Sequence, residues 1–387
     1  MARIPIHSLT NTELRKRARE LLPRGHGFAR RVHRRAMLEG RFEPERFGLG
    51  PEACAAWASN FSFDLPDIVA MKSDESEHGA TSKMVLRLDD GLEAESVCIP
   101  MGRDRYTLCV SSQVGCKMGC AFCETGRMGL LRHLRTEEII AQVLVAKHRL
   151  GWPIRNIVFM GMGEALDNAD HVIQAIRVLN DEAGLAIGQE RLTICTAGHV
   201  EGIRALDRQN FKRLNLSISL NAANDSLRSE IMPVNRRTNL AELQDALKGY
   251  RPRRNFALGV NYCLLPGIND TQEDARGVAD LCGPLGRVLV NVIPYNPGTK
   301  PLTRAPEEAE VEQFIAWLRA EGLPVRERVT KGRSVMAACG QLGNPEARRK
   351  RAMRESSSSL VIPRGHADAS GVESSSSLVI PPARPHP

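Results

Sequence analysis

Three cysteines stand within eight positions of the chain, at Cys116, Cys120 and Cys123. This C-x3-C-x2-C spacing places three soft thiolates on one short loop. Thiolates select zinc, copper(I) or iron–sulfur clusters. A structural zinc site takes four protein ligands, commonly from paired C-x2-C arms, and the sequence has no second arm. The motif therefore favours an iron–sulfur cluster in which one iron has no protein ligand.

An iron with an open position can chelate the amino and carboxylate groups of S-adenosylmethionine. Reduction of the cluster then splits that molecule and yields a 5′-deoxyadenosyl radical. Phe122, the aromatic residue directly before the third cysteine, is typical of such loops. A zinc loop, or cysteines without a common role, is the alternative reading of the same motif.

The elements that would position this loop follow a regular rhythm from residue 105 onward. Apolar runs that predict β-strands alternate with stretches that predict helices, which is the pattern of parallel strands joined by right-handed crossovers. Six such units predict an α/β fold with a partial or complete β/α barrel, followed by a helix at Glu307–Glu321 and a last strand at Pro324–Val329. The predicted strands are Tyr106–Ser112, Asn156–Met162, Leu192–Thr196, Leu214–Leu220, Ala257–Leu265 and Val288–Tyr295. The predicted helices are Thr136–Leu150, Ala169–Ala183, Glu201–Arg208, Leu240–Tyr250 and Thr271–Leu281.

Parallel β/α barrels carry their chemistry on the loops at the C-terminal ends of the strands. The cysteine loop follows the first predicted strand, and Gly161-Met162-Gly163-Glu164 follows the second. Glycine lets backbone carbonyl groups approach a ligand ammonium closely, and Glu164 adds a negative charge. Polar or small residues also end the third, fourth and sixth strands, in Thr196-Ala197-Gly198, Ser219-Leu220-Asn221 and Pro294-Tyr295-Asn296-Pro297-Gly298.

The ends of the chain differ from the predicted barrel. Residues 8–46 predict short helices with Ser8 as the first N-cap, and Met84–Leu88 with Glu93–Ile99 predict a hairpin around Asp90-Gly91. From Glu355 the chain is rich in serine and proline and repeats Glu-Ser-Ser-Ser-Ser-Leu-Val-Ile-Pro, a composition that cannot bury a core. We therefore expect three parts: residues 1–104 as an accessory region, 105–345 as the barrel with a C-terminal loop, and 346–387 as a basic run and disordered tail.

Composition and charge limit the class of protein. Of the 387 residues, 42% are apolar and 25% charged, which excludes global disorder, and no apolar run reaches the roughly 18 residues that a membrane span needs. Ten cysteines are too dilute for a disulfide scaffold, and we expect a cytoplasmic protein. The net charge of +8 is concentrated at the ends, with 12 Lys or Arg against 5 Asp or Glu in residues 1–46 and a basic run at Arg348–Arg354. Such a distribution indicates a polyanionic partner or, alternatively, solvated basic surfaces.

These motifs together resemble the radical S-adenosylmethionine RNA methyltransferases of the RlmN/Cfr family, which methylate carbon 2 or carbon 8 of adenosine. The similarity covers residues from about 60 to 345. The matching segments are Thr107–Cys116, the three-cysteine loop, Gly161–Glu164, Ser219-Leu220, Ile293–Pro297 and Ala337-Ala338-Cys339-Gly340-Gln341-Leu342.

The resemblance implies a role for individual residues. Cys116, Cys120 and Cys123 would hold a [4Fe–4S] cluster. Cys339 would carry the methyl group, Cys109 would be its disulfide partner, and Glu95 would accept a proton. S-adenosylmethionine would be bound by Gly163, Glu164, Cys195, Ser219, Leu220, Asn221 and Asn296.

The resemblance further implies the reaction and its partners. It indicates methylation of an adenosine carbon, carbon 2 in preference to carbon 8, in 23S ribosomal RNA, transfer RNA or both, through an S-methylcysteine. An electron donor such as flavodoxin or ferredoxin is implied, and we expect a monomer that does not bind membranes. The alternatives are a radical enzyme acting on a substrate other than RNA, and a zinc-stabilised RNA-binding protein.

Some positions depart from the family pattern or have a simpler interpretation. The family usually has serine at position 195, where this chain has Cys195, and histidine at position 221, where it has Asn221. Cys109 lies in an apolar strand, where a buried free cysteine is common, and Glu95 lies in a hairpin, where an exposed carboxylate is the default. The remaining cysteines without a supporting motif are interpreted as core: Cys54, Cys98, Cys263 and Cys282.

Overall fold

The computed structural model of the chain describes residues 3–77, 79–102, 105–250 and 253–343. The chain divides into two units, residues 1–348 and 349–387, and every described residue belongs to the first. The predicted disordered tail and the basic run Arg348–Arg354 lie outside the described residues.

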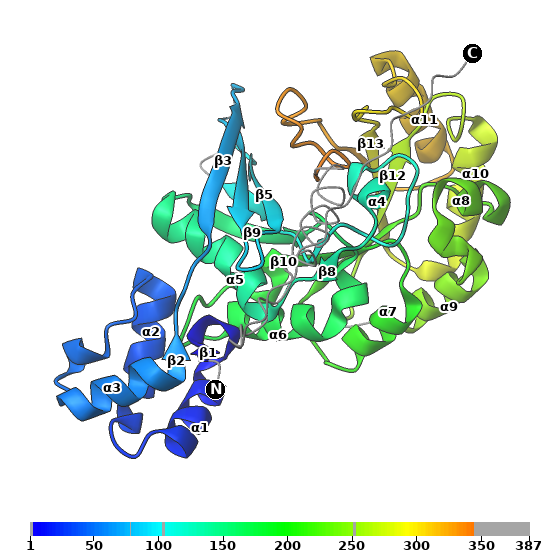
Figure 1. Ribbon diagram of the computed structural model, residues 1–387. Helices are drawn as coiled ribbons and strands as arrows, with labels where there is room; N and C mark the ends of the chain where they lie inside the picture. The colour runs from blue at the N-terminus through cyan, green and yellow to red at the C-terminus, as the bar shows by residue number, and fades with distance from the viewer. Residues whose placement is uncertain (1–2, 78, 103–104, 251–252, 344–387) are drawn as a thin grey trace, which may run out of the picture. The chain divides into compact units, whose positions relative to one another are not determined.

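One sheet of ten strands, in the order β14-β13-β12-β11-β10-β9-β6-β5-β4-β3, organises the fold (Figure 1). From β6 to β14 every neighbouring pair is parallel. The central strands are buried along most of their length, as expected of a parallel sheet covered on both faces. The predicted α/β fold, with parallel strands that alternate with helices, is thereby confirmed. Its strands are β6 (Tyr106–Cys109), β9 (Ile154–Phe159), β10 (Leu192–Thr196), β11 (Asn215–Ser219), β12 (Leu258–Leu264), β13 (Val288–Pro294) and β14 (Val325–Glu327).

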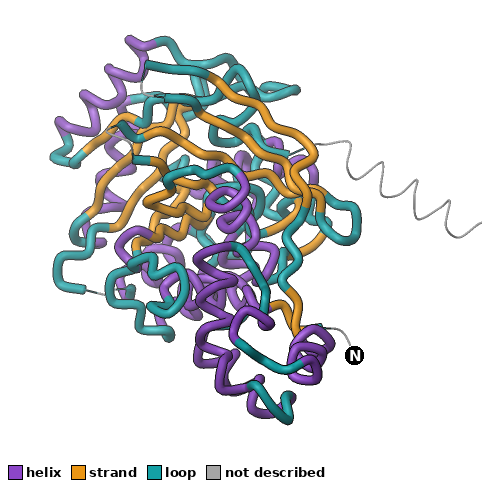
Figure 2. Tube along the Cα trace, turned by 90° about the vertical axis from the view of Figure 1, so that its left-hand side faces the viewer, coloured by secondary structure: helices purple, strands orange, loops and turns teal. Residues whose placement is uncertain are grey.

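The helices between these strands follow the predicted ranges to within a few residues and lie along the sheet (Figures 1 and 2). Local sequence sets their starts: Asn239 with Glu242, and Thr271 with Asp274, form capping boxes at two of them. Two short helices, α4 (Glu124–Met128) and α8 (Asp225–Ile231), were not predicted. The others are α5 (Thr136–Leu144, continued by a π-helical turn at Val145–Arg149), α6 (Ala169–Asn180), α7 (Val200–Asp207), α9 (Leu240–Gly249), α10 (Gln272–Cys282) and α11 (Glu308–Ala320).

An antiparallel extension continues the sheet beyond β6. The predicted hairpin is present as β4 (Thr81–Arg87) and β5 (Glu93–Pro100), and Gly91 takes a φ of 79° in its turn. A third strand, β3 (Asp67–Asp74), pairs with β4. The sequence did not predict β3 because its side chains are mostly exposed and show no apolar alternation.

The N-terminal residues form a helical head with a core of its own, built around Leu14, Val32, Trp57 and Phe61. Its helices are α1 (Asn11–Leu21), α2 (Ala29–Glu39) and α3 (Pro51–Asn60), and a short parallel pair, β1 (Ile4–Pro5) and β2 (Phe61–Ser62), joins its two ends. No helix among the described residues is long and apolar enough to cross a bilayer.

The prediction that Ser8 caps the first helix is wrong. The Ser8 hydroxyl donates to the Pro5 carbonyl at 2.8 Å, in a 3-10 turn that precedes α1. Thr10 is the N-cap, because the Glu13 carboxylate accepts the Thr10 N–H at 2.7 Å and completes a capping box that Ser8 does not offer.

Candidate active site

A cavity of about 160 Å³ lies at the C-terminal ends of the parallel strands. It brings together nine of the predicted site residues, which lie up to 223 positions apart in the sequence. These are Cys116, Cys120, Cys123, Gly163, Glu164, Cys195, Ser219, Asn221 and Cys339. Four others do not line it: Glu95, Cys109, Leu220 and Asn296.

The cysteine loop takes its shape from two close backbone approaches. Gly115 has a φ of 77°, and a Cβ there would lie 1.8 Å from the Gly129 carbonyl oxygen, so no other residue fits. The next residue, Cys116, donates its N–H to that same oxygen at 3.1 Å. Farther along, Ala121 donates its N–H to the Ile231 carbonyl at 3.0 Å. The loop is therefore held at both ends before any ligand binds.

The three thiols of the loop would become thiolates only beside a cationic partner. Burial raises the pKa of Cys116 to about 12 and raises the pKa of Cys120 and Cys123. Mutual charge repulsion adds to this, because Cys123 and Cys116 further raise the pKa of Cys120. Buried thiolates in this arrangement are stabilised when iron coordinates them.

The donor set fits a cluster better than a single ion. Among the residues that the structure describes, no three His, Cys, Asp or Glu side chains converge on the position of one metal ion. Ligands of a cluster need not converge in this way, because each thiolate binds a different iron. Three cysteines around one cavity suit an iron–sulfur cluster.

The glycines after β9 are required by their neighbours. A Cβ on Gly161 would lie 2.7 Å from the Val110 carbonyl oxygen, and one on Gly163, whose φ is 103°, would lie 2.6 Å from Cβ of Gln113. Both contacts are to the segment that leads into the cysteine loop. The glycines thus let the ends of β6 and β9 come together, which is a packing reason for residues first interpreted through their approach to a ligand.

Glu164 joins the ends of β9 and β10. Its carboxylate is buried and accepts the Ala197 N–H at 2.7 Å and the Leu166 N–H at 3.1 Å. Burial nevertheless dominates and raises the pKa of Glu164 to about 6. A carboxylate that lines the cavity with so perturbed a pKa has the character of a ligand-binding group.

Cys339 reaches the cavity on a loop tied to the short helix α4 (Glu124–Met128), which follows the cysteine loop. The N–H of Glu124 donates to the Gly340 carbonyl at 2.8 Å, and the Thr125 hydroxyl donates to the Leu342 carbonyl at 2.6 Å. The Cys339 side chain itself is exposed, so a reactant in the cavity has access to its sulfur.

Cys109, at the end of β6, has a free and buried thiol that does not line this cavity. Burial raises its pKa, and the charge of Cys339 raises it further. The cavity therefore has three thiols from one loop, a buried carboxylate and an exposed thiol.

Comparison with known proteins assigns this arrangement to a family. A profile of the Radical SAM superfamily matches residues 110–282. The chain is 46% identical over 273 residues to a probable dual-specificity RNA methyltransferase RlmN 1 of Protochlamydia amoebophila, covering 70% of this chain and 76% of the relative. It is 41% identical over 268 residues to the dual-specificity RNA methyltransferase RlmN of Geobacter sulfurreducens, covering 69% and 73%.

A solved structure agrees with these relatives. The crystal structure of a radical SAM methyltransferase from Sphaerobacter thermophilus superposes with a TM-score of 0.79 at 34% identity, covering 87% of this chain and 98% of that one. The chain belongs to the RlmN family of radical-SAM RNA methyltransferases. Membership implies S-adenosylmethionine and an iron–sulfur cluster as cofactors, and it decides against the alternative of a zinc-stabilised binding protein.

The two departures from the RlmN family pattern are both accommodated by polar partners. The Cys195 sulfur accepts a hydrogen bond from the Asn261 amide at 3.2 Å and lies 3.6 Å from the Ser219 hydroxyl. The Asn221 amide oxygen accepts the Cys263 N–H at 2.8 Å, and the Asn221 backbone adopts a φ of 60°, which asparagine tolerates. The amide oxygen of Asn221 is thus hydrogen-bonded within the protein.

Two predicted cofactor residues turn their side chains elsewhere. Leu220 is completely buried in the core. Asn296 is also buried, and its amide oxygen accepts a hydrogen bond from Nε of Arg333 at 3.1 Å. The backbone of Leu220 is also bonded within the protein, since its N–H donates to the Asn261 carbonyl at 2.9 Å and its carbonyl accepts from Nε of Arg228 at 3.0 Å.

The expectation of an exposed Glu95 is wrong. Glu95 is 8% exposed, and its carboxylate lies 3.2 Å from the Lys83 ammonium. Lys83 also donates to the Met336 carbonyl at 2.9 Å, three residues before Cys339. The hairpin is buried on this side because the C-terminal loop covers it, a long-range contact that no local pattern reveals.

Two residues of the cavity were missed in the sequence. Cys263 was interpreted as core but lines the cavity. The pKa of its thiol is raised chiefly by burial and further by the charges of Cys339 and Cys123. Asn261 lines it as well and pairs through its amide oxygen with Asn291 at 3.1 Å. A polar residue inside an apolar strand was the available signal for Asn261. The core interpretation holds for Cys98 and Cys282, which are buried away from the cavity.

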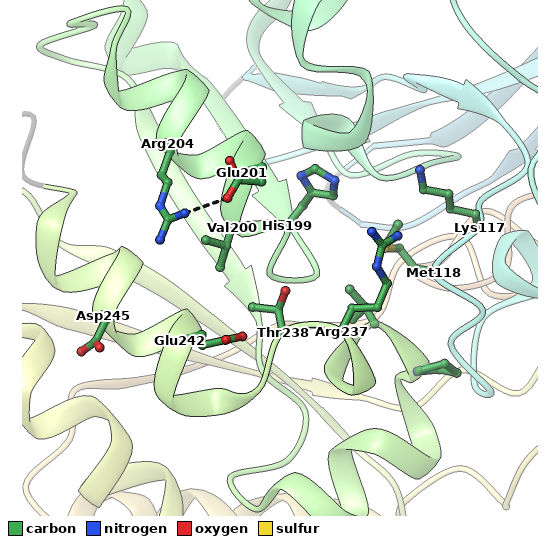
Figure 3. Close-up of a pocket in the computed structure, with 12 residues that line it drawn as sticks. Lys117, Met118, His199, Val200, Glu201, Arg204, Arg237, Thr238, Glu242 and Asp245 are labelled. Carbon is green, nitrogen blue, oxygen red and sulfur yellow. Dashed lines mark hydrogen bonds and ion pairs between the residues drawn. The ribbon is translucent and has the colours of Figure 1, made fainter.

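A second cavity, of about 560 Å³, opens beside the cysteine loop between α7 and the start of α9 (Figure 3). Met118 lines both cavities. The exposed Lys117 pairs with Asp167 at 2.5 Å, and Arg204 pairs with Glu201 at 2.7 Å, as the dashed line in Figure 3 marks. The outer side of the cysteine loop is therefore accessible through this cavity.

Proposed function

We propose that the protein methylates an adenosine carbon in RNA, carbon 2 in preference to carbon 8, through an S-methylcysteine formed on Cys339. The observation that carries this proposal is the position of Cys339, an exposed thiol in the same cavity as the three cysteines of the loop. RNA as the substrate is supported by the relatives' name, dual-specificity RNA methyltransferase. We include both 23S ribosomal RNA and transfer RNA as targets.

The cofactors would occupy the cavity between the strand ends. Cys116, Cys120 and Cys123 would hold a [4Fe–4S] cluster, and Glu164 would face the ammonium group of S-adenosylmethionine. That site would be completed by Gly163, Cys195, Ser219, Leu220, Asn221 and Asn296. When bound, these groups supply a methyl group and, by one-electron reduction, an organic radical.

Cys339 would act first as a nucleophile. Its thiolate takes a methyl group by displacement, and the resulting thioether remains in the cavity. The organic radical would then take a hydrogen atom from this S-methyl group, and the resulting methylene radical would add to the adenine ring. The ring would become aromatic again by losing one electron, which would return to the cofactor that supplied it, and one proton. At this stage the RNA is covalently attached to Cys339. This indirect route is needed because adenine carbon 2 is electrophilic and cannot itself attack a methyl group as a nucleophile.

Cys109 would release the product. Its thiolate attacks the Cys339 sulfur, so a sulfur–sulfur bond forms while the sulfur–carbon bond to RNA breaks. The electron pair stays on the carbon, which takes a proton to become the methyl group. The electrostatic influence of Cys339 on Cys109 supports this pairing. We propose Glu95 as the acceptor of the ring proton, supported by its buried position under the Cys339 loop.

RNA affinity would come in part from the helical head. The outward faces of α1 and α2 carry seven exposed cationic side chains, at Arg15, Lys16, Arg17, Arg19, Arg30, Arg31 and Arg34. Such side chains bind phosphate groups without reading sequence. We propose in addition an electron donor of the flavodoxin or ferredoxin type, a monomeric state, and the three-part division of the chain at residues 104 and 345.

Analysis of the nucleosides of treated RNA tests the reaction. Reconstituted protein, S-adenosylmethionine and a reductant are incubated with RNA that lacks the modification, and the nucleosides are separated by mass spectrometry. We expect 2-methyladenosine in ribosomal or transfer RNA. Formation of 8-methyladenosine would show that carbon 8, and not carbon 2, is methylated. If 5′-deoxyadenosine forms but no methylated adenosine is found, RNA is not the substrate.

A further inference from the structure

Arg228, in α8, is a fully buried arginine at the strand ends, 1% exposed. Its guanidinium donates four hydrogen bonds. Nε donates to the Leu220 carbonyl at 3.0 Å and Nη1 to the Asn235 amide oxygen at 2.7 Å. Nη2 donates to the carbonyl groups of Ala197 at 2.7 Å and Ser219 at 3.3 Å. The side chain thus ties together the ends of β10 and β11.

All four acceptors are neutral. Within the described part of the chain, no carboxylate lies within ion-pair distance of Arg228, whereas many exposed arginines have one. Burial lowers its pKa to about 10, which still leaves the group charged at neutral pH. The charge of Asp225 also acts on Arg228, but its carboxylate accepts a hydrogen bond from Asn235 and forms no ion pair with the guanidinium. Burying a cation without an ion-pair partner costs several kcal/mol in general. Hydrogen bonds to carbonyl groups could be supplied by a neutral side chain, so the charge itself needs an explanation.

The charge lies directly behind the wall of the cofactor cavity. Ala197 and Ser219, whose carbonyl groups Arg228 holds, both line that cavity. The helix of Arg228 ends at Ile231, whose carbonyl accepts the N–H of Ala121 between two of the cluster cysteines. Burial raises the pKa of Cys120, and the charge of Arg228 opposes that rise.

We propose that Arg228 is the fixed counter-charge of the iron–sulfur cluster and raises its reduction potential. The inference rests on the proposed cluster at Cys116, Cys120 and Cys123. A cluster held by three thiolates carries a net negative charge, which increases by one when it accepts an electron. A nearby buried cation therefore stabilises the reduced form more than the oxidised form. Arg228 is a positioning residue, since it acts on the cluster through space and through the strand ends.

The test is a redox titration of the reconstituted full-length protein, followed by the electron paramagnetic resonance signal of the reduced cluster. For Arg228→Gln we expect the equilibrium constant of reduction to fall about tenfold, which is a shift of about 59 mV to more negative potential for one electron. For Arg228→Lys, which keeps the charge and loses the fork of donors, we expect less than half of that shift. Arg236→Gln is the matched control, because Arg236 is exposed and also donates to a backbone carbonyl, that of Ser229.

The outcomes separate the possible roles of Arg228. Equal potentials in wild type and Arg228→Gln would overturn the proposal, as would an equal shift in the Lys and Gln variants, which would indicate a clamp whose charge is irrelevant. If Arg228→Gln fails to bind iron, the Lys variant alone decides, because its potential must stay near that of the wild type. Thermal unfolding of the iron-free proteins reports the loss of the clamp separately. A wild-type protein that binds no iron would instead contradict the proposed function.

Discussion

The hydroxyl of Thr125 donates a 2.6 Å hydrogen bond to the carbonyl oxygen of Leu342, across 217 positions of sequence. This bond is buried and connects the helix after the cysteine loop to the loop that carries Cys339.

Replacing Thr125 by valine preserves the shape of the side chain and leaves the Leu342 carbonyl unpaired, which costs about 1–3 kcal/mol. We expect methylation of Cys339 to fall at least about tenfold through misplacement of the sulfur, while 5′-deoxyadenosine is still formed. Mass spectrometry of the protein measures the first and chromatography the second, and Thr125→Ser should behave as wild type. Equal loss of both activities would contradict this assignment.

Replacement of any one of Cys116, Cys120 and Cys123 by alanine should abolish the formation of 5′-deoxyadenosine. Each loss removes one of the three ligands on the loop. The other thiols that line the cavity, those of Cys195, Cys263 and Cys339, lie on other elements of the chain. Iron content after anaerobic reconstitution and chromatography of the products measure the effect. Cys98→Ala is the control, since Cys98 is buried outside the cavity. Retained cleavage of S-adenosylmethionine in any of the three variants would refute the cluster assignment.

Replacement of Cys109 by alanine should trap the protein on its RNA. Methylation of Cys339 and addition to the ring do not involve Cys109, whereas release requires a second thiol. We expect a covalent adduct through Cys339, seen on a denaturing gel as a band whose shift disappears with RNase. Cys339→Ala should give neither an adduct nor a methylated protein. Normal turnover by Cys109→Ala would show that Cys109 is only a buried cysteine of β6.

Binding of S-adenosylmethionine should weaken at acid pH because of Glu164. In the free protein, burial raises the pKa of this carboxyl to about 6, so below that pH it is neutral and must lose its proton before it can face an ammonium group. The affinity should therefore be constant above about pH 7 and fall by up to about tenfold per pH unit below 6. Calorimetric titration from about one pH unit below the raised pKa to about two units above it measures this dependence. Glu164→Gln should bind weakly and with no slope in this range, and an unchanged slope in that variant would assign the titration to another group.

Neutralising the outer face of α1 should weaken RNA binding at low salt. Arg15, Lys16 and Arg19 are exposed there. Replacing all three by glutamine should reduce the slope of log affinity against log salt by about 2 to 3, since each phosphate contact contributes about 0.7 to 0.9. Filter binding over a range of salt concentrations measures the slope. The matched control replaces Lys248, Arg276 and Arg319, which are exposed cations on α9, α10 and α11, and the same change in both triple variants would refute a specific role of the head.

Charge replacement is preferable to removal of the head because the head packs on the barrel. The Gln174 amide of α6 donates to the Ser8 carbonyl at 3.1 Å and to the Glu13 carboxylate at 2.7 Å. His33 of the head is buried as well. A truncation would expose this surface, and its effect on RNA binding would be mixed with a loss of stability.

The sequence by itself determined the class of chemistry and the order of the elements. The cysteine spacing and the alternation of apolar runs with helical stretches predicted the cofactor and every parallel strand from β6 to β14. Both signals are local: ligands on one loop have a characteristic spacing, and a buried parallel strand is apolar along most of its length. Local signals failed where exposure hid the pattern, as in β3.

Only the tertiary structure decided which distant residues meet. The C-terminal loop covers the hairpin, so Glu95 is buried beside Lys83 and Cys339 enters the cavity. In the folded chain Cys263, which the sequence indicated as a core residue, lines the cavity, and Arg228 is buried next to residues that line it. Burial and pairing of a polar group depend on segments from other elements, and the free energy that decides them comes from desolvation and from hydrogen bonds that form only when the chain is folded.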